Sequence, residues 1–343
     1  MQRISRREWL RRIGLPFLGA FGAVALACRS RVSPVAPEPT PSTGSPAATS
    51  TPPPAAATAA PAATDVPPSP APTGTAYLAV ARGSSPTANV EAARRAIGGI
   101  ERFVQPGNDV IVKPNICVAY HTPEYAATTN PEVVAALVRL CLGAGAKRVR
   151  VMDQPFGGTA EEAYNRSGIA GAVQSAGGEM EIMAGMKFAS AAIPGGQDIT
   201  EWPVYRDALD ADVLINVPIA KTHDLAVLTL GMKNLMGLIE DRGGLHPNLA
   251  QRLADLTTLF RPALTIVDAT RILVANGPSG GNLEDVRQTQ TIVASHDIVA
   301  ADAYAATLFG LTAADIPATR AGAAMGLGTL DLAGIRIEEI STG

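Results

Sequence analysis

The chain has 343 residues, of which 47% are hydrophobic and only 4% aromatic, with 28 Lys and Arg against 31 Asp and Glu. Seven of the basic and three of the acidic residues lie in residues 1–75, which leaves 21 basic and 28 acidic residues, a formal charge of −7, for residues 76–343. An acidic segment with few aromatic side chains excludes nucleic acid as the expected partner, whereas its length is enough for one large hydrophobic core or two small ones.

The first residues have the features of an export signal. Arg6 and Arg7 are followed by Glu8, Trp9 and Leu10, and an apolar run of 15 residues extends over 13–27. This run suits the apolar part of a signal better than a membrane span. Adjacent arginines before an aromatic residue and Leu resemble a twin-arginine signal, so we predict export by that route. A buried helix that happens to begin the chain is the alternative.

Cys28 ends the apolar run after the small residues Ala25 and Ala27, an arrangement that resembles a lipoprotein cleavage box. Ala25 stands where Leu is usual. We predict a signal over 1–28, lipidation of Cys28 and anchoring at the outer face of the cell membrane. Residues 29–75 are rich in Pro, Ala, Thr and Ser and cannot bury enough apolar surface to fold, which predicts a disordered, semi-rigid linker. The domain is then 76–343.

Within this domain, strand-like and helix-like segments alternate. In chain order, we predict a strand over 77–81, a helix over 89–102, a strand over 109–112, a helix from Pro131 to Leu142 capped by Asn130, a strand over 148–152, a helix over 159–166, and strands over 179–183, 199–205 and 213–217. Helices over 226–239 and 247–260, strands over 264–267 and 291–294, a helix over 297–308 and a strand over 335–340 follow.

The alternation predicts the α/β class: a mostly parallel sheet with helices on both faces. Ligands of such sheets bind at the carboxyl ends of the strands. Polar residues that follow predicted strands are therefore candidate site residues.

Lysines stand out at these positions, because the domain has only five. Lys113 ends the strand over 109–112, Lys221 follows the strand over 213–217, and Lys233 lies in an apolar helical stretch. An unpaired ammonium there is costly, so each needs a partner. That partner is an anionic ligand, or else a carbonyl or carboxylate in a purely structural role.

Histidines and carboxylates add acid/base and metal-binding groups. His223 is two residues after Lys221, and His246 lies beyond the Lys233 stretch. Asp153 and Asp268 each end a predicted strand. These four residues are candidate ligands of a divalent metal, although the His-x-x-x-His spacing of a helical zinc motif is absent. Capping of the following helix is the alternative role for the two aspartates.

Two Gly-rich loops, 156–159 and 276–281, contain neither a Walker nor a dinucleotide-binding pattern, but both are able to present backbone amides to an anion. Besides Cys28, the chain has Cys117 and Cys141. Two thiols do not make a zinc or iron–sulfur site by themselves. We expect two buried thiols rather than a disulfide, because Cys141 falls on the apolar side of its helix.

The combination of Lys221-Thr222-His223, Lys233-Asn234-Leu235-Met236-Gly237 and Asn276-Gly277-Pro278 resembles the family called domain of unknown function 362, over roughly residues 78–315. Val112-Lys113-Pro114-Asn115 and Asp297 with Asp302 support the resemblance. Many members of that family carry an added ferredoxin-like module with iron–sulfur motifs. This chain has no Cys-rich segment, so no iron–sulfur cluster is expected, and the resemblance implies a site more than an activity.

Taken together, the sequence predicts a polar site at the carboxyl ends of the strands that accepts a small anionic molecule. The leading hypothesis is an enzyme that uses acid/base or metal-assisted chemistry; a tethered binding protein without catalysis and a maturation factor for an exported redox protein are the alternatives. The assigned residues are, for catalysis, His223, Lys221 and Lys233; for substrate binding, Lys113, Asn115, Asn234, Asn276 and Gly277; and for a metal, His223, His246, Asp153 and Asp268.

Overall fold

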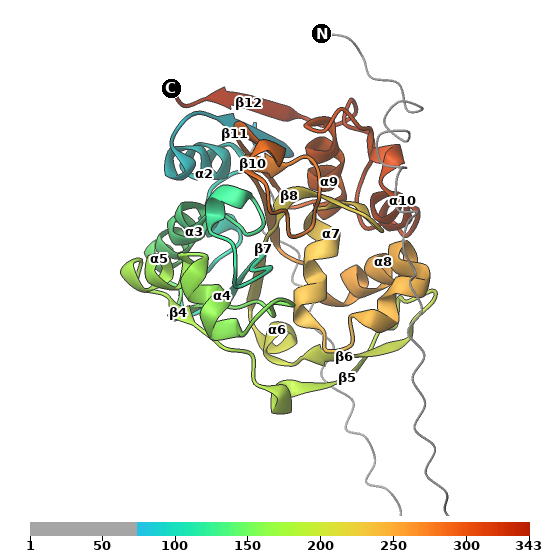
Figure 1. Ribbon diagram of the computed structural model, residues 1–343. Coiled ribbons are helices and arrows are strands. Elements are labelled where there is room, and N and C mark those ends of the chain that lie inside the picture. The colour runs from blue at the N-terminus through green and yellow to red at the C-terminus, as the bar shows by residue number, and fades with distance from the viewer. Residues whose placement is uncertain (1–73) are drawn as a thin grey trace, which may run out of the picture. The chain divides into compact units, whose positions relative to one another are not determined.

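A central β-sheet organises the part of the chain that the computed structural model describes, residues 74–343 (Figure 1). The predicted signal over 1–28 and all but the last two residues of the predicted linker lie outside the described residues. Within those residues, no helix is long and apolar enough to cross a membrane.

Ten strands form the main sheet in the order β12-β1-β11-β10-β7-β2-β3-β4, with β8 pairing β10 and β9 pairing β8. Neighbours along this order are parallel except at β11, which is antiparallel to both β1 and β10. Two further strands, β5 and β6, form a separate antiparallel pair. The strands are β1 (Leu78–Arg82), β2 (Asp109–Pro114), β3 (Arg148–Val151), β4 (Glu179–Met180), β5 (Phe188–Ala192), β6 (Glu201–Tyr205), β7 (Val213–Val217), β8 (Ile219–His223), β9 (Val227–Thr229), β10 (Leu264–Leu273), β11 (Val286–Ser295) and β12 (Ile337–Ser341).

Helices cover both faces of this sheet, with α2 to α5 on one side and α7 to α10 on the other (Figure 1). They are α2 (Pro86–Ala96), α3 (Pro131–Gly143), α4 (Ala160–Arg166), α5 (Ile169–Ser175), α6 (Asp207–Asp210), α7 (Gly231–Asn234), α8 (Leu249–Phe260), α9 (Ile298–Thr307) and α10 (Pro317–Ala324).

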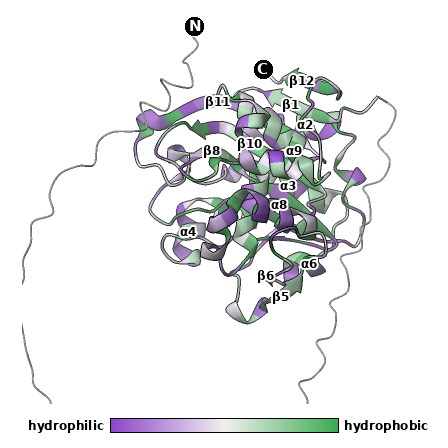
Figure 2. Cartoon of the chain, turned by 90° about the vertical axis from the view of Figure 1, so that its right-hand side faces the viewer, coloured by the Kyte–Doolittle hydropathy of each residue, from purple (hydrophilic) through white to green (hydrophobic). Residues whose placement is uncertain are grey.

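The core is divided by the sheet into two layers. In β2, Val110 and Val112 pack in the cluster that includes α3, whereas Ile111 between them packs in the cluster that includes α8. Successive strand residues point to opposite faces, so a strand covered on both faces needs an unbroken apolar run. Figure 2 colours the residues by hydropathy and shows apolar stretches, in green, near β8 and β10. The predicted mixed α/β class with a mostly parallel sheet is confirmed.

Several helix starts follow from their caps as predicted. The Asn130 side chain accepts a hydrogen bond from the Glu132 amide at 2.9 Å, with Pro131 at the first helical position of α3. The Thr159 hydroxyl and the Glu162 carboxylate form a reciprocal capping box at α4. These local signals act within one turn, which is why the sequence alone located them.

The predicted helix over 226–239 is wrong. The chain continues from β7 through Pro218 into β8. The Pro218 carbonyl accepts a hydrogen bond from the Asp268 amide of β10 at 2.8 Å, so β7 and β8 pair one after the other along β10. β9 then returns antiparallel to β8. Within residues 226–239, only α7 and the 3₁₀ segment η4 (Leu235–Leu238) are helical. Pairing of β9 with β8 outweighs local helix propensity at the start of this apolar stretch.

Other boundaries also differ from the predictions. The helix predicted over 89–102 begins earlier, after the cap Ser85, and ends at Ala96, because Gly98 and Gly99 have φ of 99° and 87°. β10 and β11 extend beyond the predicted 264–267 and 291–294 by pairing with each other past a bulge. The elements β5, α5, α6 and α10 were not predicted.

The two described cysteines are thiols. Cys141 is buried on α3 and Cys117 is buried in the loop after β2, and they are not joined to each other. This agrees with the expectation of two buried thiols.

Candidate functional site

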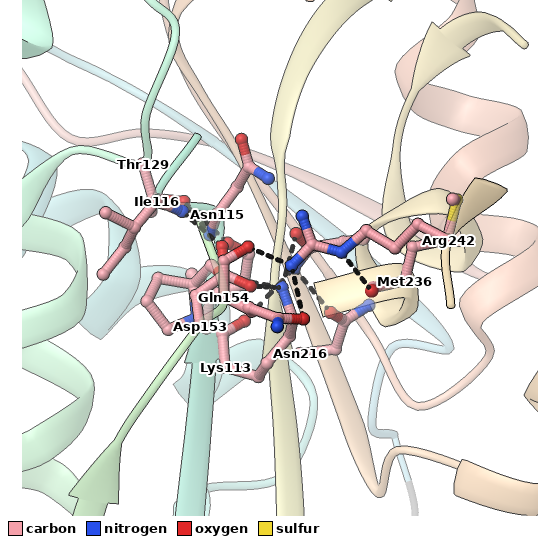
Figure 3. Close-up of polar contacts among 12 residues, drawn as sticks. Lys113, Asn115, Ile116, Thr129, Asp153, Gln154, Asn216, Met236 and Arg242 are labelled. Carbon is pink, nitrogen blue, oxygen red and sulfur yellow. Dashed lines mark hydrogen bonds and ion pairs between the residues drawn. The ribbon is translucent and has the colours of Figure 1, made fainter. Parts of the chain in front are cut away.

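The carboxyl ends of three adjacent parallel strands bring polar side chains together. Lys113 near the end of β2 lies opposite Asn216 of β7, and Asp153 follows β3, the neighbour of β2 on its other side. Parallel strands end at the same edge of a sheet, so residues far apart in the sequence meet there. Figure 3 shows this cluster.

Lys113 is fully buried and its ammonium contacts three acceptors. Its Nζ lies 2.7 Å from Asp153 Oδ1 and donates to the Pro114 carbonyl at 2.9 Å and to Asn234 Oδ1 at 3.0 Å. Burial lowers the pKa of Lys113 to about 8, against the raising effect of the Asp153 charge. Because an ammonium has three N–H groups, Lys113 has no donor left for a substrate. It connects elements rather than binding a ligand directly.

Asn234 of α7 completes this structural centre. Its Nδ2 donates to the Lys113 carbonyl at 3.2 Å and to Asn216 Oδ1 at 2.9 Å, while Asn216 Nδ2 donates to the Gly231 carbonyl at 2.9 Å. Both Nδ2 hydrogens of Asn234, which the sequence analysis assigned to substrate binding, are thus donated within the protein. Gly237 packs directly on the ion pair, since a Cβ there would lie 1.8 Å from Asp153 Oδ1.

Lys221 lies in β8, not in a strand-to-helix turn, and its amine is buried without a carboxylate partner. Its Nζ donates to Asn115 Oδ1 at 2.8 Å and to the Ala127 carbonyl at 2.6 Å. The Cys117 thiol is close enough to interact electrostatically with this amine. Burial lowers the pKa of Lys221. The third N–H of Lys221 interacts with the Cys117 thiol, whereas the Nδ2 group of Asn115 has no hydrogen-bond acceptor within residues 74–343.

Lys233 of α7 is the least satisfied cation of the site. Its side chain is half-buried and makes no hydrogen bond or ion pair with any residue in the described part of the chain. Burial, and then the charges of Lys221 and Arg242, lower the pKa of Lys233 to about 8. The expected convergence of Lys221 and Lys233 is thus supported by their mutual repulsion, although Lys233 lies in the first turn of a short helix and not two turns into a long one.

His223 ends β8 beside these lysines. Its Nδ1 accepts hydrogen bonds from the amides of Leu225 at 3.1 Å and Ala226 at 3.4 Å. Burial, followed by the charges of Lys233, Lys221 and His246, lowers the pKa of His223 to about 3. The ring is therefore neutral at pH 7, and because Nδ1 is an acceptor, Nε2 carries the hydrogen. A neutral ring with Nε2–H suits hydrogen-bond donation, whereas the sequence analysis assigned His223 to general acid/base catalysis.

Arg242 is a site residue that the sequence analysis missed. Its Nε donates to the Met236 carbonyl at 3.1 Å, and its Nη2 donates to the Gln154 side chain at 2.9 Å and to the Gln154 carbonyl (Figure 3). Burial lowers the pKa of Arg242, and its charge acts on both Lys113 and Lys233. The available signal was an arginine shortly after the apolar stretch, following Glu240-Asp241 and preceding Gly243-Gly244.

The loop containing Asn276 and Gly277 lies against β8. The Gly277 amide donates to Thr222 Oγ1 at 3.2 Å, and a Cβ on Gly277 would lie 1.9 Å from the Thr222 carbonyl oxygen, so only glycine fits. Asn276 is exposed and its Nδ2 donates to Asp285 at 2.7 Å. The loop borders the site between Lys221 and His223, but the Asn276 amide is already bonded.

The four predicted metal ligands are not gathered. Asp153 is bound to Lys113 and accepts the Ile116 amide at 2.6 Å, and Asp268 is fully buried with bonds from the Asn130 amide at 2.7 Å and from Thr270. His246 is exposed. Among residues 74–343, no three His, Cys, Asp or Glu side chains form a group able to hold a metal ion. The predicted set His223, His246, Asp153 and Asp268 is thus not assembled.

The fold and site define an α/β protein with a cationic cluster at the carboxyl ends of its strands. The chain belongs to the family described as domain of unknown function 362, whose match covers residues 110–307 and so includes every lysine and arginine of the cluster. This confirms the resemblance noted from the motifs.

The chain is similar in sequence to one protein and in structure to another. The thylakoid-associated protein sll1697 of Synechocystis sp. is 30% identical over 240 residues, which are 67% of this chain and 72% of that protein. The structure of the lactate racemase apoprotein from Thermoanaerobacterium thermosaccharolyticum has a TM-score of 0.40 at 13% identity, and the match covers 66% of this chain and 55% of that one.

Proposed function

We propose that this protein binds a small carboxylate or phosphate compound in the cationic cluster, defined as Lys221, Lys233, Arg242, His223 and Asn115, and acts on it as an enzyme. The observation that carries the proposal is the charge imbalance of the site. Asp153 is paired with Lys113, and the other three cations have no carboxylate partner within residues 74–343. A bound anion removes this repulsion.

The donors left unused by the protein fit such an anion. They are the Lys233 ammonium, Nη1 of Arg242, Nε2 of His223 and Nδ2 of Asn115. Charge-assisted hydrogen bonds from ammonium and guanidinium groups to carboxylate or phosphate oxygens are among the stronger ones in proteins. The predicted role of Lys221 and Lys233 is therefore kept, Arg242 joins them, and Lys113 contributes only its charge.

Catalysis is favoured over binding alone by Lys233. A binding site gains most from lysines that stay charged, whereas a lysine with a pKa of about 8 is able to accept a proton near neutral pH. The tethered binding protein remains the alternative. It predicts that no compound retained by the site is converted, whereas the enzyme is expected to convert its ligand and to lose turnover in Lys233→Met.

Titration calorimetry with inorganic phosphate and with succinate tests the anion site. We expect the Kd for at least one of them to rise about tenfold or more in Lys233→Met, since a charge-assisted hydrogen bond contributes about 1.5–3 kcal/mol. Lys147→Met removes an exposed lysine and is the matched control, with an unchanged Kd. Equal weakening by both variants would show that only the overall charge matters, and the absence of any binding would remove the proposal.

Export and anchoring complete the proposed function. The arginine pair and Cys28 support delivery to the outer face of the cell membrane, with residues 29–75 as the tether. The relative described as thylakoid-associated supports a place at a membrane surface.

A further inference from the structure

Lys233 differs from every other lysine of the chain. Lys113 and Lys221 are held by acceptors, Lys187 forms ion pairs with Glu181 at 2.9 Å and Asp207 at 2.8 Å, and Lys147 is exposed. Lys233 is half-buried with no acceptor among residues 74–343. An amine that nothing holds in its charged form is available to react through its lone pair.

The groups that surround Lys233 favour the neutral amine. Lys221 of β8, Arg242 and Lys113 of β2 all oppose its charge, and His223 is neutral beside it; only the Cys117 thiol, as a thiolate, would favour the ammonium, but burial raises the pKa of Cys117. With a pKa of about 8, about a quarter of Lys233 is neutral at pH 7.5, compared with about 0.1% of an ordinary lysine. This is about a 200-fold larger population of the nucleophilic form.

We propose that Lys233 forms an imine with the carbonyl carbon of a small oxo acid whose carboxylate is bound by the other members of the cationic cluster. The inference rests on the proposed anion site and names its substrate class. The site combines the two features that such chemistry needs, an unheld amine and neighbouring donors for a carboxylate, on elements that the Lys113 centre fixes in place.

The proposed step is balanced without a cofactor. The lone pair of neutral Lys233 adds to the carbonyl carbon, the π electrons of the C=O bond move to oxygen, and the nitrogen proton is transferred to that oxygen. Loss of the hydroxyl group as water consumes one proton, which the Lys221 ammonium supplies, and the iminium nitrogen then returns its N–H proton to Lys221, which leaves the neutral C=N bond. One amine and one carbonyl give one imine and one water.

Reductive trapping tests the inference on the full-length protein. Glyoxylate and sodium cyanoborohydride are added at pH 7.5, and peptide mass spectrometry measures the rate of adduct formation at each lysine. We expect Lys233 to react at least tenfold faster than exposed Lys147. With uncharged acetaldehyde in place of glyoxylate, most of the preference for Lys233 over Lys147 should disappear. Succinate should slow adduct formation at Lys233 but not at Lys147.

Lys233→Arg keeps the charge and removes the nucleophile, so it should bind phosphate within about threefold of the wild type and give no rapid adduct. If Lys233 and Lys147 react equally while phosphate or succinate still binds, the imine is wrong and the anion site stands. If acetaldehyde shows the same preference as glyoxylate, the oxo-acid class is wrong. If neither anion binds and no preference appears, both proposals fail.

Discussion

Lys113 is fully buried and Lys233 is half-buried, and both have a pKa of about 8, yet their surroundings give them opposite roles. Lys113 compensates Asp153, a carboxylate whose side chain is 3% exposed. Lys233 compensates nothing, so its charge is a cost that the folded protein carries in the absence of ligand. Unpaired charges of this kind are typical of functional sites, where stability is lost in favour of activity.

Lys113→Met should therefore destabilise the protein strongly. It leaves the Asp153 carboxylate buried without its cation, and breaking a buried ion pair costs about 3–5 kcal/mol. Chemical denaturation at pH 7 measures the loss in free energy of unfolding. The double variant Lys113→Met with Asp153→Leu should recover part of it, because no isolated charge remains. A Lys113→Met protein as stable as the wild type would contradict the structural role assigned here.

Lys233→Met should have the opposite effect, a gain of about 2 kcal/mol at pH 7 in anion-free buffer. Its pKa is about 8 when folded and near 10.5 when unfolded, so the unfolded state binds more protons between these values. The wild type consequently recovers stability as pH rises from about 8 to 10.5. The gain in the variant should be largest below pH 8 and disappear near pH 10.5; a gain independent of pH would point to apolar packing instead.

At the scale of elements, the short α7 and η4 follow from what they must contact. Gly231 and Met232 amides donate to Asp302 of α9 at 2.6 and 3.0 Å, which fixes the start of α7. Ile239 then forms an antiparallel bridge with Val204, which ends the helical stretch. Residues 231–239 are thus fixed at one end by Asp302 and at the other by Val204, which are far away in the sequence. These contacts hold Asn234, and with it Lys233, near the carboxyl ends of β2 and β7.

Gly237→Ala tests this packing of η4 on the ion pair. The added Cβ would lie 1.8 Å from Asp153 Oδ1 and 2.5 Å from Lys113 Nζ, so the segment has to move. We expect a loss of about 1–3 kcal/mol in free energy of unfolding. Gly243→Ala is the matched control, because its Cβ would come no nearer than 3.6 Å to Asp241 and should change stability little. Similar effects of the two changes would argue against close packing at Gly237.

At the scale of the whole molecule, the proposed export depends on the first residues. Arg6→Lys with Arg7→Lys keeps the charge but removes the paired guanidinium groups, so the protein should stay in the cytoplasm. Cell fractionation measures this. Arg11→Lys with Arg12→Lys makes the same chemical change outside the pair and should leave export intact. Normal export of the first variant would overturn the twin-arginine assignment.

Anchoring is a separate prediction. A labelled fatty acid should enter the wild type and Cys141→Ala but not Cys28→Ser, because only Cys28 follows the small residues of the cleavage box. Detergent phase partitioning of the exported protein gives an independent measure. If the wild type partitions into the aqueous phase and carries no label, residues 29–75 are a stalk without an anchor.

The sequence by itself determined the features that depend on short-range physics. The Asn130–Pro131 helix start and the helix start at Thr159 follow from local caps, and the burial of β2 on both faces follows from its apolar run. The motifs also identified the family. The three lysines were recognised because a lysine at the end of a predicted strand, or within an apolar stretch, is unusual.

Only the tertiary structure decided what these lysines do. It paired Lys113 with Asp153 and Asn234, and it held Lys221 by neutral oxygens. It left Lys233 without a hydrogen-bond or ion-pair partner among residues 74–343, added Arg242 and removed Asp268 from the site. It also turned the predicted helix over 226–239 into a hairpin and a short helix. The physical reason is the separation of the interacting residues along the sequence. The hydrogen bond from Lys113 to Asn234 joins residues 121 positions apart, and a local sequence pattern does not specify which acceptor a buried amine contacts.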